Sequence, residues 1–120
     1  MNFDEINDFC LSLKGAYLDF PFNEFTAVYK IAGKMFLMTA LDDFPISIVI
    51  KCDPDESLEL IDKYEFISTG YHMSKKHWIS IITEESKYEL LYKDLITKSY
   101  NLVYSKLTKK LKEIVNSTNI

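Results

Sequence analysis

The chain has 120 residues, of which 48% are hydrophobic, and its formal net charge at pH 7 is −4. This size and composition predict a single globular domain spanning residues 1–120 and exclude a disordered chain. Two cysteines are too few for a disulfide framework, and the chain contains neither a basic leader nor an apolar run long enough to cross a membrane, so we expect a cytoplasmic protein.

The N-terminal part of the chain predicts one amphipathic helix. Apolar residues recur at helical spacing over residues 3–13, and Asn2 with Glu5 forms the pattern of a capping box. Gly15 follows as the residue that ends the helix in a left-handed conformation. The aromatic segment 17–25 contains a proline, so we expect irregular backbone there.

Three antiparallel strands follow as a meander. Residues 26–31 and 34–40 predict two strands joined at Ala32-Gly33, where glycine permits the positive φ of a tight turn. Residues 46–51 predict the third strand, because alternate isoleucines share one face of it.

A capped helix is predicted next. Asp53 is followed by a proline and two acids, which is the pattern of an N-cap and a first helical turn. We expect this helix to end at Tyr64 and to bury Leu58 and Ile61.

Two further strands are predicted at residues 66–70 and 78–83, and two helices follow them. Ser86 and Glu89 form a second capping-box pattern at the start of the longest helix, and Thr108 precedes a short basic helix. The order α-β-β-β-α-β-β-α-α defines an α+β fold with two layers, in which helices cover one face of an antiparallel sheet of about five strands.

The sequence contains no catalytic constellation, and we expect a protein that is not an enzyme. Glycine-rich phosphate loops and nucleophile-elbow motifs are absent. Cys52 with His72 or His77 is one candidate nucleophile pair. A cysteine at the end of an apolar strand is more typical of a structural thiol.

An acidic edge on the first helix is the one candidate for metal binding. Asp4, Glu5 and Asp8 share one side of the predicted helix, and carboxylates in that arrangement attract hard cations. The simpler interpretation is a solvated helix face whose acids suit the helix dipole. We therefore expect no metal and no cofactor.

The nine residues GYHMSKKHW, 70 to 78, contain both histidines, the only tryptophan and a lysine pair. Cationic and aromatic side chains on a short connection are typical of nucleic-acid surfaces, where lysines neutralise phosphates and rings stack on bases. The alternative is an ordinary polar turn with its rings in the core. We expect a mixture, in which Trp78 is mostly structural while Lys75 and Lys76 are exposed.

This motif, together with KIAGKMFLM upstream and IKCDPDESLEL between them, closely resembles the MmcQ/YjbR family of small bacterial proteins. The resemblance extends from the helix before Gly15 to Lys109-Lys110-Leu111, and several separate motifs occur in the same order. It implies a compact α+β domain similar in layout to frataxin and to secretion chaperones.

The resemblance also implies a function, because members of the family are commonly labelled DNA-binding through two hairpin wings. In this sequence the Gly33-Lys34 hairpin would be one wing, and the connection around Lys75 and Lys76 would be the other. We predict a non-enzymatic DNA-binding module with double-stranded DNA as its partner. The residues that we predict to contact nucleic acid are Lys34, Lys75, Lys76, His77, Lys109 and Lys110, and those that we predict to shape the motif are Gly70, Tyr71, His72 and Trp78.

Several features predict that DNA binding is weak and not sequence-specific. All 14 Lys or Arg positions are lysine, whereas arginine is the preferred residue for two-point contacts with bases. Ser74 stands where the family often has asparagine.

The first 62 residues carry 12 acids and four lysines, and the others carry six acids and ten lysines. This asymmetry either marks a surface that faces a polyanion or disperses when the chain folds.

The competing prediction is an adaptor that binds a protein or a small ligand and has no role on DNA. Phe20, Phe22 and Phe25 lie close together in the sequence and exceed what the core of a small domain can hold. An exposed apolar patch at these residues would favour the adaptor.

Overall fold

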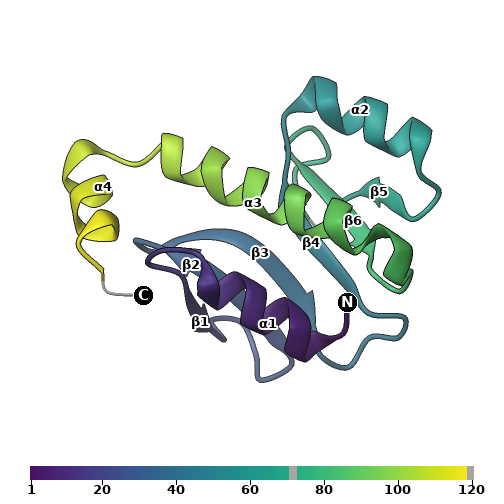
Figure 1. Cartoon of the computed structure of the whole chain (residues 1–120), viewed down its shortest axis with the longest axis horizontal. Helices are drawn as coiled ribbons and strands as arrows, with labels where there is room; N and C mark the ends of the chain where they lie inside the picture. Colours follow the sequence, from purple (N-terminus) through teal and green to yellow (C-terminus); the bar gives the residue numbers. More distant parts are fainter. Residues whose placement is uncertain (71–72, 119–120) are drawn as a thin grey trace.

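The computed structural model, which describes residues 1–70 and 73–118, shows an open antiparallel sheet with helices packed against it (Figure 1). The sheet has six strands in the order β1-β2-β3-β4-β6-β5. The predicted α+β class is confirmed, with one strand more than expected. The helices are α1 (Phe3–Ser12), α2 (Pro54–Lys63), α3 (Glu89–Ser105) and α4 (Lys109–Asn116). The strands are β1 (Tyr17–Asp19), β2 (Thr26–Ile31), β3 (Lys34–Ala40), β4 (Ser47–Lys51), β5 (Ile67–Thr69) and β6 (Trp78–Ile82).

A row of side chains across the central strands forms the middle of the core. The register places Tyr29 opposite Leu37, Leu37 opposite Ile50, and Ile50 opposite Ile79, and all four residues are buried. Helices α1 and α3 lie along this face (Figure 1), and the Tyr29 hydroxyl donates to Asn7 of α1 at 2.6 Å. The central strands and the two helices therefore share one core.

The β2–β3 hairpin has the predicted turn. Ala32 and Gly33 both have positive φ, 46° and 80°, as a two-residue hairpin turn requires. Further along, the register shifts between Tyr29 and Lys30, so that β3 carries one extra residue, Phe36. This bulge makes β3 irregular at the end that follows the β2–β3 turn.

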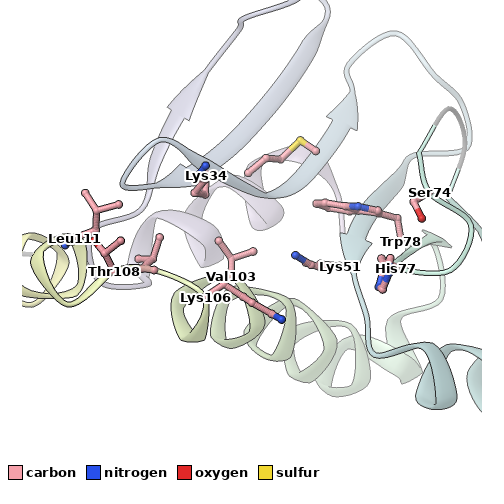
Figure 2. Close-up of a pocket in the computed structure, with 11 residues that line it drawn as sticks. Lys34, Lys51, Ser74, His77, Trp78, Val103, Lys106, Thr108 and Leu111 are labelled. Atoms are coloured by element: carbon pink, nitrogen blue, oxygen red, sulfur yellow. Dashed lines mark hydrogen bonds between the residues drawn. The ribbon is translucent and has the colours of Figure 1, made fainter.

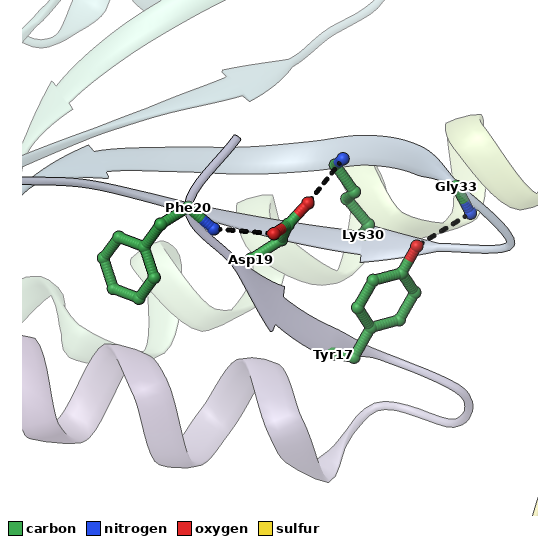
Figure 3. Close-up of polar contacts among 5 residues, drawn as sticks. All are labelled: Tyr17, Asp19, Phe20, Lys30 and Gly33. Carbon is green, nitrogen blue, oxygen red and sulfur yellow. Dashed lines mark hydrogen bonds and ion pairs between the residues drawn. The ribbon is translucent and has the colours of Figure 1, made fainter. Parts of the chain in front are cut away.

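The prediction of irregular backbone after α1 is wrong for β1, which pairs with β2. Asp19 of β1 forms a 2.9 Å ion pair with Lys30, and the Tyr17 hydroxyl accepts a 3.1 Å hydrogen bond from the N–H of Gly33 (Figure 3). These contacts join β1 to the neighbouring hairpin. Since they link residues distant in sequence, a local pattern does not reveal them.

Helix α2 has the predicted start, but one of its predicted core residues is wrong. Asp53 caps it by accepting from the N–H of Asp55 at 3.0 Å. Ile61 packs against the core as expected, whereas Leu58 is 70% exposed and the neighbouring Ser57 is buried. The buried face follows the helical spacing from Ser57 through Ile61, which turns Leu58 outward.

The predicted capping box before α3 is also wrong. Ser86–Tyr88 forms a short 3₁₀ turn, η1, and α3 begins at Glu89 without a side-chain cap. The N–H of Tyr88 donates to the carbonyl of Glu85 at 3.0 Å, and this tighter turn replaces the first α-helical turn.

The starts of α1 and α4 follow the sequence pattern. Asn2 and Glu5 form a complete capping box, and the Thr108 side chain caps α4 by accepting from the N–H of Leu111 at 3.2 Å. Gly15 has the predicted positive φ of 75°, but it does not cap α1, which ends at Ser12 with Leu13 as its extended C-cap. Across residues 1–70 and 73–118, no helix has the length and apolar character needed to cross a membrane.

Candidate binding groove

Strands β3 and β4 part at one end of the sheet, and a helix side chain fills the gap between them. Their ladder ends at the pair Leu37–Ile50. Beyond it, the Ser99 hydroxyl of α3 donates to the carbonyl of Phe36 at 2.6 Å and accepts from the N–H of Lys51 at 2.8 Å. This hydroxyl replaces the next ladder bond and holds the two strands apart.

A groove of about 840 Å³, which we call the basic groove, lies at this opening. Figure 2 shows Lys34 on one side and Lys51 and Trp78 on the other, with Val103 of α3 and Lys106, the residue that follows α3, along the floor. The indole of Trp78 extends from the start of β6 toward the middle of the groove (Figure 2). The lining residues are Lys34, Met35, Lys51, Ser74, His77, Trp78, Val103, Lys106, Leu107, Thr108 and Leu111.

The lining of the basic groove is cationic although the chain is acidic. It contains three lysines and one histidine and no carboxylate, in a chain whose net charge is −4. The ion pairs formed within residues 1–70 and 73–118 involve other lysines, namely Lys30, Lys87 and Lys98. Cations gathered on the walls of a groove produce a positive potential that attracts anions.

A second, smaller pocket of about 370 Å³ differs in its electrostatics. Its single lysine, Lys98, lies 3.1 Å from a carboxylate oxygen of Glu56, which also lines the pocket. Asp94 approaches the same amine at 3.6 Å. Because this cation is paired within the protein, the pocket offers an anion much less than the basic groove does.

In the connection before β6, which we call the wing connection, some of the predicted residues face the groove and others face solvent. The carbonyl of Ser74 accepts from the N–H groups of His77 at 3.1 Å and Trp78 at 3.0 Å, which forms one helix-like turn. Ser74 and His77 lie on the groove side of this turn and line the groove. Lys75 and Lys76 are exposed, as expected, but do not line it.

The remaining predicted contact residues divide in the same way. Lys34 lines the groove, whereas Lys109 and Lys110, on the first turn of α4, are exposed outside its lining. Lys51 and Lys106 line the groove and were not among the predicted contacts. For Lys51 the sequence held one indication, because the alternation in its strand places it on the face opposite to that of the buried isoleucines. For Lys106 the sequence held no indication, because this residue lies between two helices and the way they pack cannot be read from a local pattern.

Gly70 and Trp78 pack so closely that glycine is the fitting residue. A Cβ at Gly70 would lie 2.8 Å from the Cβ of Trp78, and the Gly70 N–H donates to the Trp78 carbonyl at 2.9 Å. This contact fixes the start of β6, and with it the base of the indole. The other two residues predicted to shape the motif, Tyr71 and His72, lie outside the described residues.

Cys52 has the properties of a structural thiol. It is buried, and burial raises the pKa of its thiol to about 11, so the thiol is protonated at neutral pH. Its backbone N–H donates to the carbonyl of His77 at 2.8 Å, which joins the end of β4 to the wing connection. Burial raises the pKa of the other thiol, Cys10, to about 12.

In the acidic edge of α1, Glu5 helps to cap the N-terminus of the helix. The Glu5 carboxylate accepts from the backbone N–H of Asn2 at 3.1 Å, and this hydrogen bond lowers the pKa of Glu5. In the described part of the chain, no group of three or more His, Cys, Asp or Glu side chains is placed to hold a metal ion.

The fold and the groove together define a small α+β protein with a cationic groove at the splayed end of an antiparallel sheet. The chain belongs to the YjbR family, whose family model matches residues 11–102. The family membership expected from the sequence is thus confirmed. The matched residues include Lys34, Lys51 and Trp78, while Lys106 and α4 lie beyond them.

Relatives and solved structures agree with this assignment. The chain is 43% identical over 101 residues to the uncharacterized protein YbdF of Escherichia coli O157:H7, covering 83% of this chain and 82% of YbdF. It is 42% identical over 53 residues to the uncharacterized protein YyaQ of Bacillus subtilis, covering 44% of each chain. The crystal structure of Deinococcus radiodurans DR2400, with the domain DUF419, has a TM-score of 0.89 at 28% identity and covers 96% of this chain and 88% of DR2400. A Pseudomonas syringae protein shares the fold, with a TM-score of 0.73 at 22% identity over 85% of this chain and 98% of its own.

Proposed function

We propose that this chain is a non-enzymatic nucleic-acid-binding module that contacts phosphates through the basic groove. One observation supports the proposal most directly. Lys34, Lys51, Lys106 and His77 come from four separate segments of the chain and meet around one groove with no carboxylate in its lining. Lysine neutralises phosphate as a point charge, and nucleic acid is a regular array of phosphates.

The number of groove lysines sets the expected strength of binding. Three phosphate contacts predict weak binding to duplex DNA, and the affinity should fall roughly 40-fold between 50 and 200 mM salt. Because the lining contains no arginine, the groove lacks the side chain best suited to two-point contacts with guanine. We therefore expect binding without sequence preference.

The experiment compares three charge-reversed double variants. Each of Lys34→Glu/Lys106→Glu, Lys75→Glu/Lys76→Glu and Lys109→Glu/Lys110→Glu changes the net charge by the same amount. All six positions are exposed, so the folds should survive, and circular dichroism would check this. Affinity for a fluorescein-labelled oligonucleotide would be measured by anisotropy at 50 mM salt.

The variants separate the groove from the wing and from α4. We expect the groove pair to weaken binding by more than tenfold and the α4 pair to weaken it only a few-fold, through long-range electrostatics. Equal losses in all three variants would indicate a general effect of net charge and would contradict a groove site. A loss confined to Lys75→Glu/Lys76→Glu would move the contact to the outer side of the wing. Absence of binding by the wild-type protein would reject the proposed function.

A separate observation favours the adaptor as a second candidate. Phe20, Phe22 and Phe25 are 41%, 68% and 50% exposed, and the N–H of Leu41 donates to the Phe25 carbonyl at 2.7 Å. This bond brings the β3–β4 connection, in which Phe44 is 94% exposed, to the same end of the sheet. Exposed aromatic side chains at one end of a small domain are typical of a protein-binding surface.

Site-specific crosslinking would test the adaptor. A photoreactive amino acid in place of Phe22 should give a discrete protein adduct in cells, whereas the same amino acid in place of the exposed Lys109 should not. Equal adducts from both positions, or none from Phe22, would count against this candidate.

A further inference from the structure

We propose that the basic groove accepts one unpaired nucleotide unit, with its base against the indole of Trp78 and its phosphate among the lysines. The unit is either a free nucleotide or part of a single strand. This inference deepens the proposed function and rests on it, because both use the same cations. It changes the expected ligand from a duplex to an unpaired base that carries phosphate.

The size of the groove suits such a unit. At about 840 Å³, the basic groove lies within the range of roughly 300–1,000 Å³ that is typical of small-ligand sites. Lys34, next to the β2–β3 turn, lines it on one side, and Ser74 and His77, in the connection before β6, line it on the other (Figure 2). This volume is large enough for a base with its sugar and phosphate.

The lining matches both halves of a nucleotide. Besides Trp78, the apolar side chains of Met35, Val103 and Leu107 contribute to the lining. Around this apolar part lie the amines of Lys34, Lys51 and Lys106. Inorganic phosphate would use only the amines, and a nucleoside only the apolar wall. A ligand with a flat ring and a phosphate uses both, which is the combination found where single-stranded nucleic acids bind.

The position of the indole disfavours duplex DNA as the preferred ligand. Trp78 lies in the groove lining and extends along it, between the two sides of the splayed sheet (Figure 2). In a duplex each base is paired and stacked, so its face reaches such an indole only after costly unstacking. An unpaired base reaches it directly, and stacking on an aromatic side chain contributes about 1–3 kcal/mol per base.

The first measurement uses the emission of Trp78, which is the only tryptophan in the chain. The wild-type protein would be titrated with adenosine 5′-triphosphate, adenosine, inorganic triphosphate, an oligothymidine single strand and a duplex of equal length. We expect saturable quenching by the nucleotide and the single strand, and at least tenfold weaker binding of adenosine and of inorganic triphosphate.

Three variants then test the ring and the charge separately. Trp78→Leu should weaken binding of a labelled single strand by about tenfold, because it removes the stacking surface, and Trp78→Phe should restore much of the affinity. If neither Trp78 variant folds, Lys51→Gln/Lys106→Gln provides the second route. It should weaken the nucleotide and the single strand together and flatten their salt dependence.

The outcomes distinguish this inference from the proposed function. Equal or tighter binding of duplex, with no loss in Trp78→Leu, would overturn the unpaired-nucleotide site and leave nucleic-acid binding intact. Binding of the free nucleotide without binding of the strand would support the site and show that its ligand is a free nucleotide. The same result would reject the nucleic-acid function. If inorganic triphosphate bound as tightly as the nucleotide, the base would have no role and the inference would fail.

Discussion

The two ends of the β3–β4 seam are held by hydroxyl groups in opposite ways. At the closed end, the Thr39 hydroxyl of β3 donates directly to the carbonyl of Ser47 on β4 at 2.7 Å. At the groove end, the hydroxyl comes from Ser99 on α3 and bonds to both strands. The difference shows how the strands separate at one end of the seam while the Phe36 carbonyl and the Lys51 N–H keep a hydrogen-bond partner.

The same two ends also differ in charge. The connection that follows the closed end of β3 carries two exposed aspartates, Asp42 and Asp43. The groove end carries Lys34 and Lys51, with Lys106 below them. Since Lys34 and Lys51 belong to the acidic half of the sequence, the charge asymmetry along the chain does not map directly onto two surfaces. The folded protein gathers cations where the strands part.

The largest effect should come from removing the hydroxyl at the groove end. Ser99→Ala leaves the Phe36 carbonyl and the Lys51 N–H without their partner inside the protein. We expect the free energy of unfolding to fall by about 2–4 kcal/mol, measured by urea denaturation. Thr39→Val is the matched control, because it removes one hydroxyl bond at the closed end and should cost about 1 kcal/mol. Equal losses in the two variants would show that the two ends are alike in energy.

The next effect tests the wall of the groove at Trp78. Gly70→Ala places a methyl group 2.8 Å from the Trp78 Cβ and 3.1 Å from its backbone. Backbone atoms cannot move aside cheaply, so we expect a loss of about 1–3 kcal/mol and a shift in tryptophan emission. Ser68→Ala, at an exposed position on β5, which ends just before Gly70, should change neither quantity. An unaltered emission spectrum in Gly70→Ala would contradict the close packing.

A smaller effect concerns the pH dependence of stability at the end of β4. Burial raises the pKa of the Cys52 thiol from 9.0 to about 11, so the unfolded chain ionises first as pH rises. Stability from this group is therefore complete below pH 9 and declines as pH increases toward 11. Between pH 8 and 10, the wild-type protein should lose about 1 kcal/mol more than Cys52→Ala does. Parallel urea titrations of both proteins would show this difference, and identical pH profiles would contradict it.

The smallest effect concerns the opposite wall, at the β2–β3 turn. Tyr17→Phe removes the hydroxyl that accepts from the Gly33 N–H beside Lys34. Because Tyr17 is partly exposed, we expect a loss of only about 0.5 kcal/mol. The Gly33 amide should nevertheless exchange with solvent faster in hydrogen-exchange NMR, whereas the Ala27 amide in the buried part of β2 should keep its rate. Unchanged exchange at Gly33 would show that the turn is rigid without this bond.

Local sequence patterns predicted most of the elements whose causes are local, and the Ser86–Glu89 capping box, which a 3₁₀ turn replaces, is the exception. The Asn2–Glu5 capping box, the Ala32-Gly33 turn and the Thr108 cap depend on residues within a few positions, and all are present. The predictions of irregular backbone at Tyr17–Asp19 and of a buried Leu58 were wrong, because β1 and the outward position of Leu58 depend on contacts between distant segments.

The candidate site was only partly accessible from the sequence for the same reason. His77 and Lys34 drew attention through nearby motifs, and both line the groove. Lys106 joins them because α3 crosses the sheet where the strands part, and that crossing depends on Ser99 meeting Phe36 across 63 positions of sequence. No spacing rule relates residues so far apart, so the complete lining required the fold.

The bridging hydroxyl of Ser99 also suggests how this scaffold can be re-engineered. The spacing between the two parts of the sheet is set by a single short side chain on a helix, and the ladder itself does not determine it. Position 99 is therefore a natural place to widen or narrow the opening while the strands keep their register. Because Ser99 is buried, a library at this position, combined with changes at Met35 and Trp78, would vary the shape of the cavity at a cost in stability that the Ser99→Ala experiment measures.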